Sequence, residues 1–165
     1  TDNKGRTVNF KNTIIIMTSN LGSQYIQQQC ANLSDANRDE VLDETRQKVM
    51  DMLKQTIRPE FLNRIDETIM FLPLTKQEIA EVVRLQMRSV GRMLAEQGFK
   101  IDVSDDAISL LADLGYDPEF GARPVKRAIQ RYVLNDLSKK ILAEEVSRDK
   151  PILIDALDGK LVFRN

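Results

Sequence analysis

Three polar side chains are the candidates for chemistry in this sequence: Asn20, Arg64 and Arg123. An arginine is always charged at neutral pH, and its planar fork of donors matches the oxygens of a phosphate group. Asn20 directly follows an apolar run, and parallel sheets bind ligands where such buried strands end. Each residue also has an ordinary explanation, because arginines commonly solvate surface turns and asparagine is common in turns that end strands. The neighbouring residues therefore have to distinguish a functional site from a solvated surface.

Arg64 lies in the stretch 58–66, whose sequence is RPEFLNRID. Pro59 fits the first position of a short helix, and Glu60 suits the positive amino end of that helix. The apolar residues of this turn, and the run 67–74 (ETIMFLPL) that is typical of a short buried strand, predict buried anchors on both sides of the arginine. We therefore expect the anchors to aim Arg64 rigidly.

Arg123 follows a Gly-Ala pair and precedes Pro124, which fits the first turn of a helix. A cation at the amino end of a helix is unfavourable by a few tenths of a kcal/mol or more, so this placement favours a nearby anion. A phosphate held by the guanidinium would supply that anion. A local ion pair with Asp117 or Glu119 would supply it equally well, and the local sequence leaves both interpretations open.

Three stretches together resemble the second ATPase module of the Clp family of AAA+ unfoldases: residues 14–20 (IIIMTSN), 58–66 and 121–127 (GARPVKR). They occur in the family's order, and the resemblance covers nearly the whole chain. It implies that residues 1–73 are the rear part of a large α/β domain and that residues 74–165 are the following small domain.

The resemblance also implies a role for each candidate residue. Arg64 is then the arginine finger, which reaches the nucleotide of the neighbouring subunit, and Asn20 is the first sensor, which orients the attacking water. Arg123 is the second sensor, which contacts the nucleotide of its own subunit and couples it to the angle between the two domains. Three further residues are implied to contact this nucleotide, the last of them at the adenine: Gly121, Ala122 and Ile79.

The sequence has no phosphate-binding loop of the form G-x-x-x-x-G-K-[ST], and no apolar strand that ends in paired acids. The resemblance places these parts, including the acids that bind Mg²⁺, upstream of Thr1. We therefore expect ATP or ADP with Mg²⁺ as cofactors of a longer, homohexameric ATPase. The fragment alone is expected neither to hydrolyse ATP nor to bind it tightly.

The stretch between the first sensor and the arginine finger indicates a branch of the family. Members that are coupled to a protease carry an apolar-Gly-apolar tripeptide there, whereas in residues 21–57 the one glycine, Gly22, is followed by Ser23. This favours a ClpB-like disaggregase, with unfolded or aggregated polypeptides as substrates and a DnaK-type chaperone as partner. The alternatives are the same part of a protease-coupled unfoldase and a non-enzymatic module that only builds an oligomer.

Composition excludes several other classes of function. The chain is 42% hydrophobic and 30% charged, as is usual for a globular protein, and its net charge of −1 argues against non-specific nucleic-acid binding. No apolar run approaches the roughly 20 residues that span a bilayer. The single Cys30 and the absence of histidine argue against a disulfide, a zinc site or His-based catalysis. The predicted setting is a reducing cytoplasm, with no metal bound by these residues.

The candidate residues need elements that position them, and the predicted fold class is α/β followed by α+β. Residues 12–19 are typical of a central strand buried on both faces, whose faces would be exposed if its neighbours are missing. Helices are expected at 23–31 and 38–55, the second of them capped by Ser34 or Asp35.

The small domain is expected to pack helices against a three-stranded sheet. Thr75 with Glu78 forms a capping box for a helix that ends at Gly98, and Ser104 caps a helix that Gly115 ends. The remaining elements are expected to be a strand at 99–103, a helix from Pro124 to about residue 145, and strands at 152–156 and 161–164 joined by a turn at 157–159.

Overall fold

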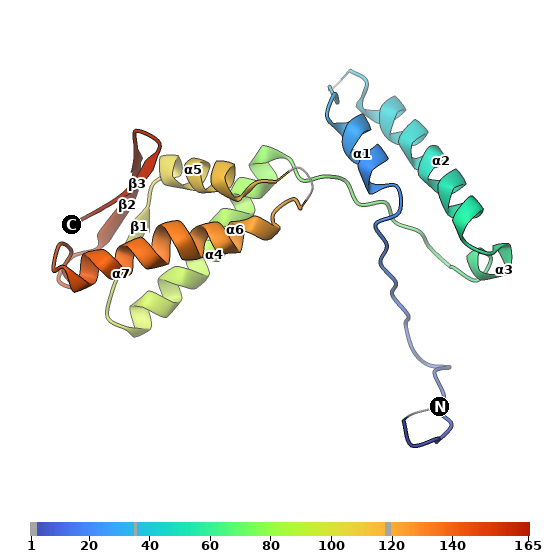
Figure 1. Cartoon of the computed structure of the whole chain (residues 1–165), viewed down its shortest axis with the longest axis horizontal. Coiled ribbons are helices and arrows are strands. Elements are labelled where there is room, and N and C mark those ends of the chain that lie inside the picture. The colour runs from blue at the N-terminus through green and yellow to red at the C-terminus, as the bar shows by residue number, and fades with distance from the viewer. Residues whose placement is uncertain (1–2, 35, 118–119) are drawn as a thin grey trace. The chain divides into compact units, whose positions relative to one another are not determined.

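A computed structural model describes residues 3–34, 36–117 and 120–165 of the chain, which form two compact units, Thr1–Met70 and Phe71–Asn165 (Figure 1). Among these residues no helix has the length and the apolar character that crossing a membrane requires. The same residues contain no group of three or more His, Cys, Asp or Glu side chains placed to hold a metal ion.

The first unit is helical. Helix α1 (Ser23–Cys30) packs along helix α2 (Arg38–Thr56), and the short helix α3 (Pro59–Leu62) follows. Ile26 of α1 and Val49 of α2 are buried. The predicted helices at 23–31 and 38–55 are therefore confirmed, although Asn37 lies at the N-cap of α2 in place of Ser34. Asp35, the other predicted cap, lies outside the described residues.

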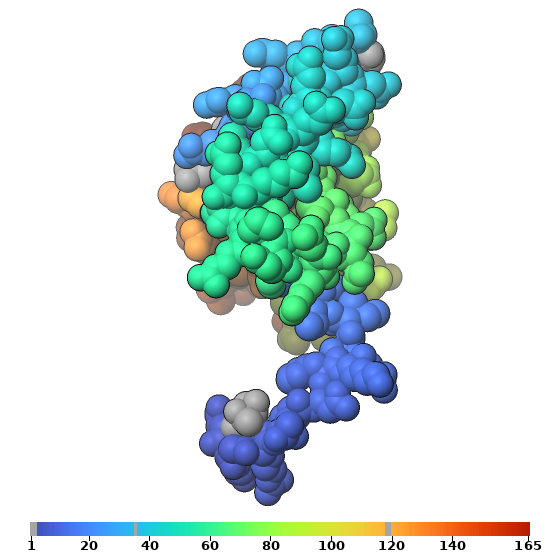
Figure 2. Space-filling model, turned by 90° about the vertical axis from the view of Figure 1, so that its right-hand side faces the viewer, coloured from blue at the N-terminus to red at the C-terminus, as the bar shows by residue number. Residues whose placement is uncertain are grey.

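The two strands predicted for the first 74 residues are wrong for this structure. Residues 12–19 and 67–74 form no strand, and Ile14 is 91% exposed. A strand needs a neighbouring strand to satisfy its backbone N–H and C=O groups, and the described residues offer none here. The expected exposure of the apolar faces is confirmed, and Figure 2 shows the blue segment near the N-terminus uncovered in that view.

The second unit packs helices against a three-stranded mixed sheet, which confirms the α+β prediction (Figure 1). Strand β1 pairs parallel with β2, and β2 pairs antiparallel with β3. The elements of the unit are, in order, α4 (Lys76–Glu96), β1 (Ile101–Val103), α5 (Asp105–Gly115), α6 (Arg123–Ala128), η1 (Ile129–Leu134), α7 (Asn135–Leu142), β2 (Ile152–Leu157) and β3 (Lys160–Arg164).

The predicted caps and the hairpin turn are present in this unit. The Thr75 side chain and the Glu78 carboxylate form a reciprocal capping box at the start of α4. The β2–β3 turn has Asp158 and Gly159 at φ 50° and 72°. Both residues are left-handed, as a type I′ turn requires, and the twist of this turn matches that of the flanking strands.

Of two further predictions for the second unit, one is confirmed and one needs correction. Gly115 is the last residue of α5, as predicted, and a Cβ built on it would lie 2.8 Å from Val125 Cα. A glycine is needed there because α6 packs against its backbone. The predicted single helix from Pro124 to about residue 145 is wrong, because it changes from α to π geometry in η1 and ends at Leu142.

Ser104 joins the start of α5 to the sheet. Its hydroxyl oxygen accepts the Ala107 N–H at 3.1 Å, and its O–H donates to Asp155 Oδ1 at 2.5 Å. The Ser104 hydroxyl, the Ala156 N–H and the Arg164 guanidinium together hold the pKa of Asp155 below its usual value. Each of these groups favours the charged carboxylate, so the carboxylate stabilises the fold only while it is ionised.

We expect Asp155→Asn to destabilise the chain at neutral pH and to have a smaller effect in acid. The folded pKa is depressed, so this stabilisation is fully present above the unfolded pKa, near 3.9, and is lost as the pH falls through the folded pKa. Urea midpoints of the chain and of Asp155→Asn, compared from pH 3 to pH 8, measure the difference. A difference that stays the same across this range would show that the charge contributes nothing.

Candidate functional site

Asn20 lies in the turn that leads into α1. Its carbonyl oxygen accepts the Ser23 N–H at 3.1 Å, and the Leu21 N–H donates to Ser19 Oγ at 3.1 Å. Gly22 then turns the chain at φ 74°, where a Cβ would also lie 3.1 Å from a methyl carbon of Val49. The turn therefore fixes the backbone of Asn20, and its side chain is exposed.

Arg64 follows α3 in a continuation of the same turn. Its N–H donates to Phe61 O at 3.1 Å, and the Ile65 N–H donates to Leu62 O at 3.1 Å. Leu62 and Ile65 are only half-buried and Phe61 is exposed, so the prediction of buried anchors is wrong for this unit. The described residues provide no apolar surface that covers the turn. The guanidinium is exposed, and it takes part in no ion pair with any described residue.

Arg123 begins α6 directly after a closed loop. Asp117 and Gly121 exchange two backbone hydrogen bonds of 3.2 and 2.7 Å, and Asp117 Oδ1 accepts the Phe120 N–H at 3.0 Å. Gly121 has φ 61°, a conformation that glycine adopts without strain. The Arg123 side chain is exposed, and within the described part of the chain no ion pair holds it. The alternative partner Glu119 lies outside that part.

The other residues predicted to contact nucleotide differ in how accessible they are. Ala122 is half-buried, and its carbonyl accepts the Val125 N–H at 3.1 Å. Ile79 is 1% exposed, because it packs into the core of the second unit with Val83 and Leu111. Ile79 thus presents almost no surface to a ligand in this structure, and its contact with adenine stays a prediction.

The candidate residues are divided between the two units. Asn20 and Arg64 belong to the first unit, where no hydrogen bond or ion pair between described residues joins them. Gly121, Ala122 and Arg123 are consecutive in the second. The helix that carries Arg123 also contains the π-turn η1, which was not predicted from the sequence. A signal was present in the sequence, because Val125, Ile129, Val133 and Leu137 are large apolar residues that recur every four positions.

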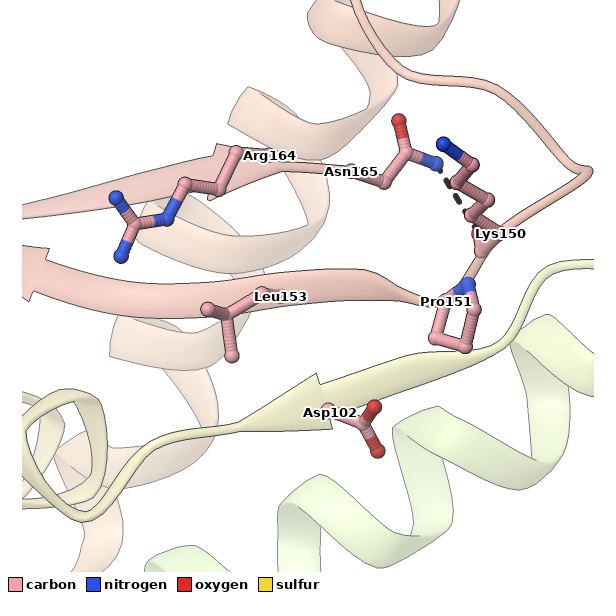
Figure 3. A pocket seen from close by; sticks show the side chains of 6 residues that line it. All are labelled: Asp102, Lys150, Pro151, Leu153, Arg164 and Asn165. Atoms are coloured by element: carbon pink, nitrogen blue, oxygen red, sulfur yellow. Dashed lines mark hydrogen bonds between the residues drawn. The ribbon is translucent and has the colours of Figure 1, made fainter.

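A shallow hollow of about 500 Å³ lies on the outer face of the sheet (Figure 3). Asp102, Leu153 and Arg164 occupy paired positions on the three strands and line it, together with Lys150, Pro151 and Asn165. None of the residues predicted to contact nucleotide lines this hollow. The guanidinium of Arg164, which lines the hollow, forms an ion pair with Asp155 at 3.0 Å.

The chemistry that these residues offer is the binding of negative charge. Two exposed guanidiniums, of Arg64 and Arg123, fit the oxygens of a phosphate, whose charge they would stabilise. Burial raises the pKa of the Cys30 thiol, an effect that nearby Arg38 only partly opposes, so this thiol is a poor nucleophile. The set therefore resembles accessory parts of a phosphate site whose main binding loop is not in this sequence.

Two family descriptions match consecutive parts of the chain. Residues 1–68 match "AAA domain (Cdc48 subfamily)", and residues 74–154 match "C-terminal, D2-small domain, of ClpB protein". The chain is 65% identical over its whole length to "Chaperone protein ClpB" of Bacteroides thetaiotaomicron and 56% identical to that of Porphyromonas gingivalis. It spans 19% of the length of each of these relatives.

Solved structures of a yeast protein share the fold. The "S. cerevisiae Hsp104-ADP complex" matches 90% of this chain and 25% of its own, with a TM-score of 0.72 at 30% identity. The "S. cerevisiae Hsp104:casein complex, Extended Conformation" matches 98% of this chain and 27% of its own, with a TM-score of 0.74 at 28% identity. The chain therefore matches about a quarter of the length of each of these yeast chains.

Proposed function

Because this chain belongs to the ClpB family of chaperones, we propose that it acts as the carboxyl-terminal part of the second ATPase module of a ring-shaped protein disaggregase. The observation that carries the proposal is the order of the two family matches, an AAA domain over residues 1–68 and a ClpB small domain over 74–154. We place the boundary between the large-domain part and the small domain at residues 73 and 74. The ClpB relatives favour the disaggregase over a protease-coupled unfoldase.

In the proposed homohexamer each candidate residue handles charge or orientation at a nucleotide site. Arg64 extends from one subunit to the phosphates bound by its neighbour, and Asn20 orients the attacking water within its own subunit. Arg123, with Gly121 and Ala122, contacts the nucleotide from the small domain of the same subunit. ATP with Mg²⁺ supplies the phosphoryl group and part of its charge neutralisation, and the exposed guanidiniums of Arg64 and Arg123 fit such an anion.

The comparison with Hsp104 supports part of the proposed set of partners. One Hsp104 structure is a complex with casein and the other is a complex with ADP. We extend both observations to this chain. The longer protein that contains it would thread unfolded or aggregated polypeptides and would bind ATP and ADP. A DnaK-type chaperone is the proposed partner that delivers aggregates, and a reducing cytoplasm is the proposed setting.

Arg123→Ala in the full-length protein is expected to weaken nucleotide binding by about tenfold, because a charge-assisted hydrogen bond to a phosphate is lost. Titration with a fluorescent nucleotide at the second module measures this directly. Arg127→Ala is the matched control, because it removes the same charge from an exposed position of the same short helix.

The same pair of variants separates the proposal from a role in assembly alone. If the chain only builds an oligomer, Arg123→Ala would leave nucleotide affinity and turnover unchanged while the ring is intact. Sedimentation at saturating nucleotide shows whether the ring forms, so that a loss of binding is not confused with a loss of assembly.

A further inference from the structure

The helix that carries Arg123 contains a π-turn, η1, between α6 and α7. The Asn135 N–H donates to the Gln130 carbonyl, five residues earlier. The side chains of the same two residues are also joined, because Gln130 Nε2 donates to Asn135 Oδ1 at 3.2 Å. In a straight α-helix, residues five apart lie about 140° apart around the axis, so this side-chain pair belongs to the π form.

Core packing explains why the helix needs this turn. Its four most deeply buried residues recur at every fourth position. Each step of four residues advances an α-helix by about 40° more than one full turn, so three such steps would carry the last residue off the buried face. A π-turn contains more residues than an α-turn, so each of its residues rotates less about the helix axis. It therefore removes part of this excess rotation. The four residues are Val125, Ile129, Val133 and Leu137, none more than 3% exposed.

The π-turn also lies where the helix passes from one core cluster to the other. Val125, Ile129 and Val133 pack in the cluster that includes residues of α4 and α5. Leu137 packs in a second cluster with Phe99 and Ile152. The geometry of η1 therefore sets how α6, which begins at Arg123, is placed relative to α7 on the sheet.

We propose that Gln130 and Asn135 form a positioning pair, which holds the π-turn closed and thereby places the Arg123 guanidinium for its nucleotide. The inference rests on the proposed function of Arg123. Both residues of the pair are exposed, so their hydrogen bond adds little to the core and can be removed without opening a cavity. Their effect on the nucleotide is transmitted through the setting of α6.

The test uses Gln130→Ala, Asn135→Ala and the double variant in the full-length protein. Each single variant is expected to raise the KM for ATP by roughly three- to tenfold, because a misplaced binding group loses part of its interaction. The double variant is expected to match the singles, since either change removes the whole bond. Ser138→Ala is the control: it removes a 2.7 Å hydroxyl bond to the carbonyl of Leu134, the last residue of η1, and leaves the Gln130–Asn135 pair in place.

Two further variants distinguish positioning from simple loss of structure. The exchange Gln130→Asn with Asn135→Gln keeps an amide pair and is expected to recover most of the affinity. In an Arg123→Ala background, Asn135→Ala is expected to change nothing more, because the pair acts through that arginine. The thermal midpoint should stay within about 2 °C of the parent, as for other exposed helix positions.

Several results would overturn the inference: pair variants that behave like Ser138→Ala, additive effects in the double variant, a lowered thermal midpoint, or a further loss in the Arg123→Ala background. Failure of the proposed function has a different signature. In that case Arg123→Ala itself leaves nucleotide affinity unchanged. If Arg123→Ala weakens binding and the pair variants do not, only the positioning inference is wrong.

Discussion

Rings built from Arg64→Ala subunits are expected to bind ATP nearly as well as the parent and to hydrolyse it at the second module on the order of 10³-fold more slowly. As the phosphoryl group transfers, negative charge spreads over its oxygens, and an arginine supplied from the next subunit stabilises that charge by 10³ to 10⁵ in rate in well-studied cases. Arg64 is exposed at the end of the α3 turn, as a residue that acts on a neighbouring subunit must be.

Steady-state ATP turnover and nucleotide titration of the full-length protein measure the two effects separately. Arg64→Lys should not restore turnover, because the planar fork and the reach of arginine are lost. Arg46→Ala is the matched control, since it removes the same charge from an exposed position of α2 in the same unit. Its turnover should equal that of the parent.

Mixed rings test whether Arg64 acts across the subunit interface. Arg64→Ala subunits keep an intact nucleotide pocket, and subunits that lack the lysine of the phosphate-binding loop keep an intact Arg64. Neither parent ring should turn over well at the second module, but rings that contain both should recover activity where an intact arginine faces an intact pocket. If mixed rings form and no activity returns, the proposed action of Arg64 on its neighbour is wrong.

Gly115→Ala is expected to destabilise the second unit by about 1–3 kcal/mol, although it adds only a methyl group. The new Cβ would lie 2.8 Å from Val125 Cα and 2.9 Å from Val125 Cγ2, so α5 and α6 would have to separate. Because Arg123 begins α6, the same shift should weaken nucleotide binding in the full-length protein. Hydrogen exchange of the α5 and α6 amides reports the loss as faster local opening.

Gly91→Ala provides the opposite case in the same unit. Gly91 lies within α4, and a Cβ there would make an ordinary 3.6 Å contact with Ile101. Alanine favours the helix more than glycine does, so this variant should slow amide hydrogen exchange in α4. The slowing should correspond to an increase of up to about 1 kcal/mol in local stability. Equal behaviour of the two variants would show that the close approach of α5 and α6 does not decide stability.

Local patterns in the sequence determined most of the helices and turns. The capping box of Thr75 and Glu78, the Ser104 cap and the Asp158-Gly159 turn involve residues within three positions of one another, so their chemistry can be read without the rest of the fold. The family resemblance rested on the same kind of evidence. Short motifs around Asn20, Arg64 and Arg123 predicted a Clp-family module. The lack of an apolar-Gly-apolar tripeptide in residues 21–57 favoured the ClpB branch, which the comparisons then confirmed.

Features that depend on distant neighbours were decided only by the tertiary structure. Residues 12–19 have the composition of a buried strand, but a strand forms only when another strand pairs with it, and none of the described residues does so. Gly115 could end a helix or admit a neighbouring one, and only the approach of Val125 distinguishes these roles. The π-turn of η1 forms for the same reason: Val133 and Leu137 must face clusters built from α4, α5 and the sheet, and no local rule contains the positions of those elements.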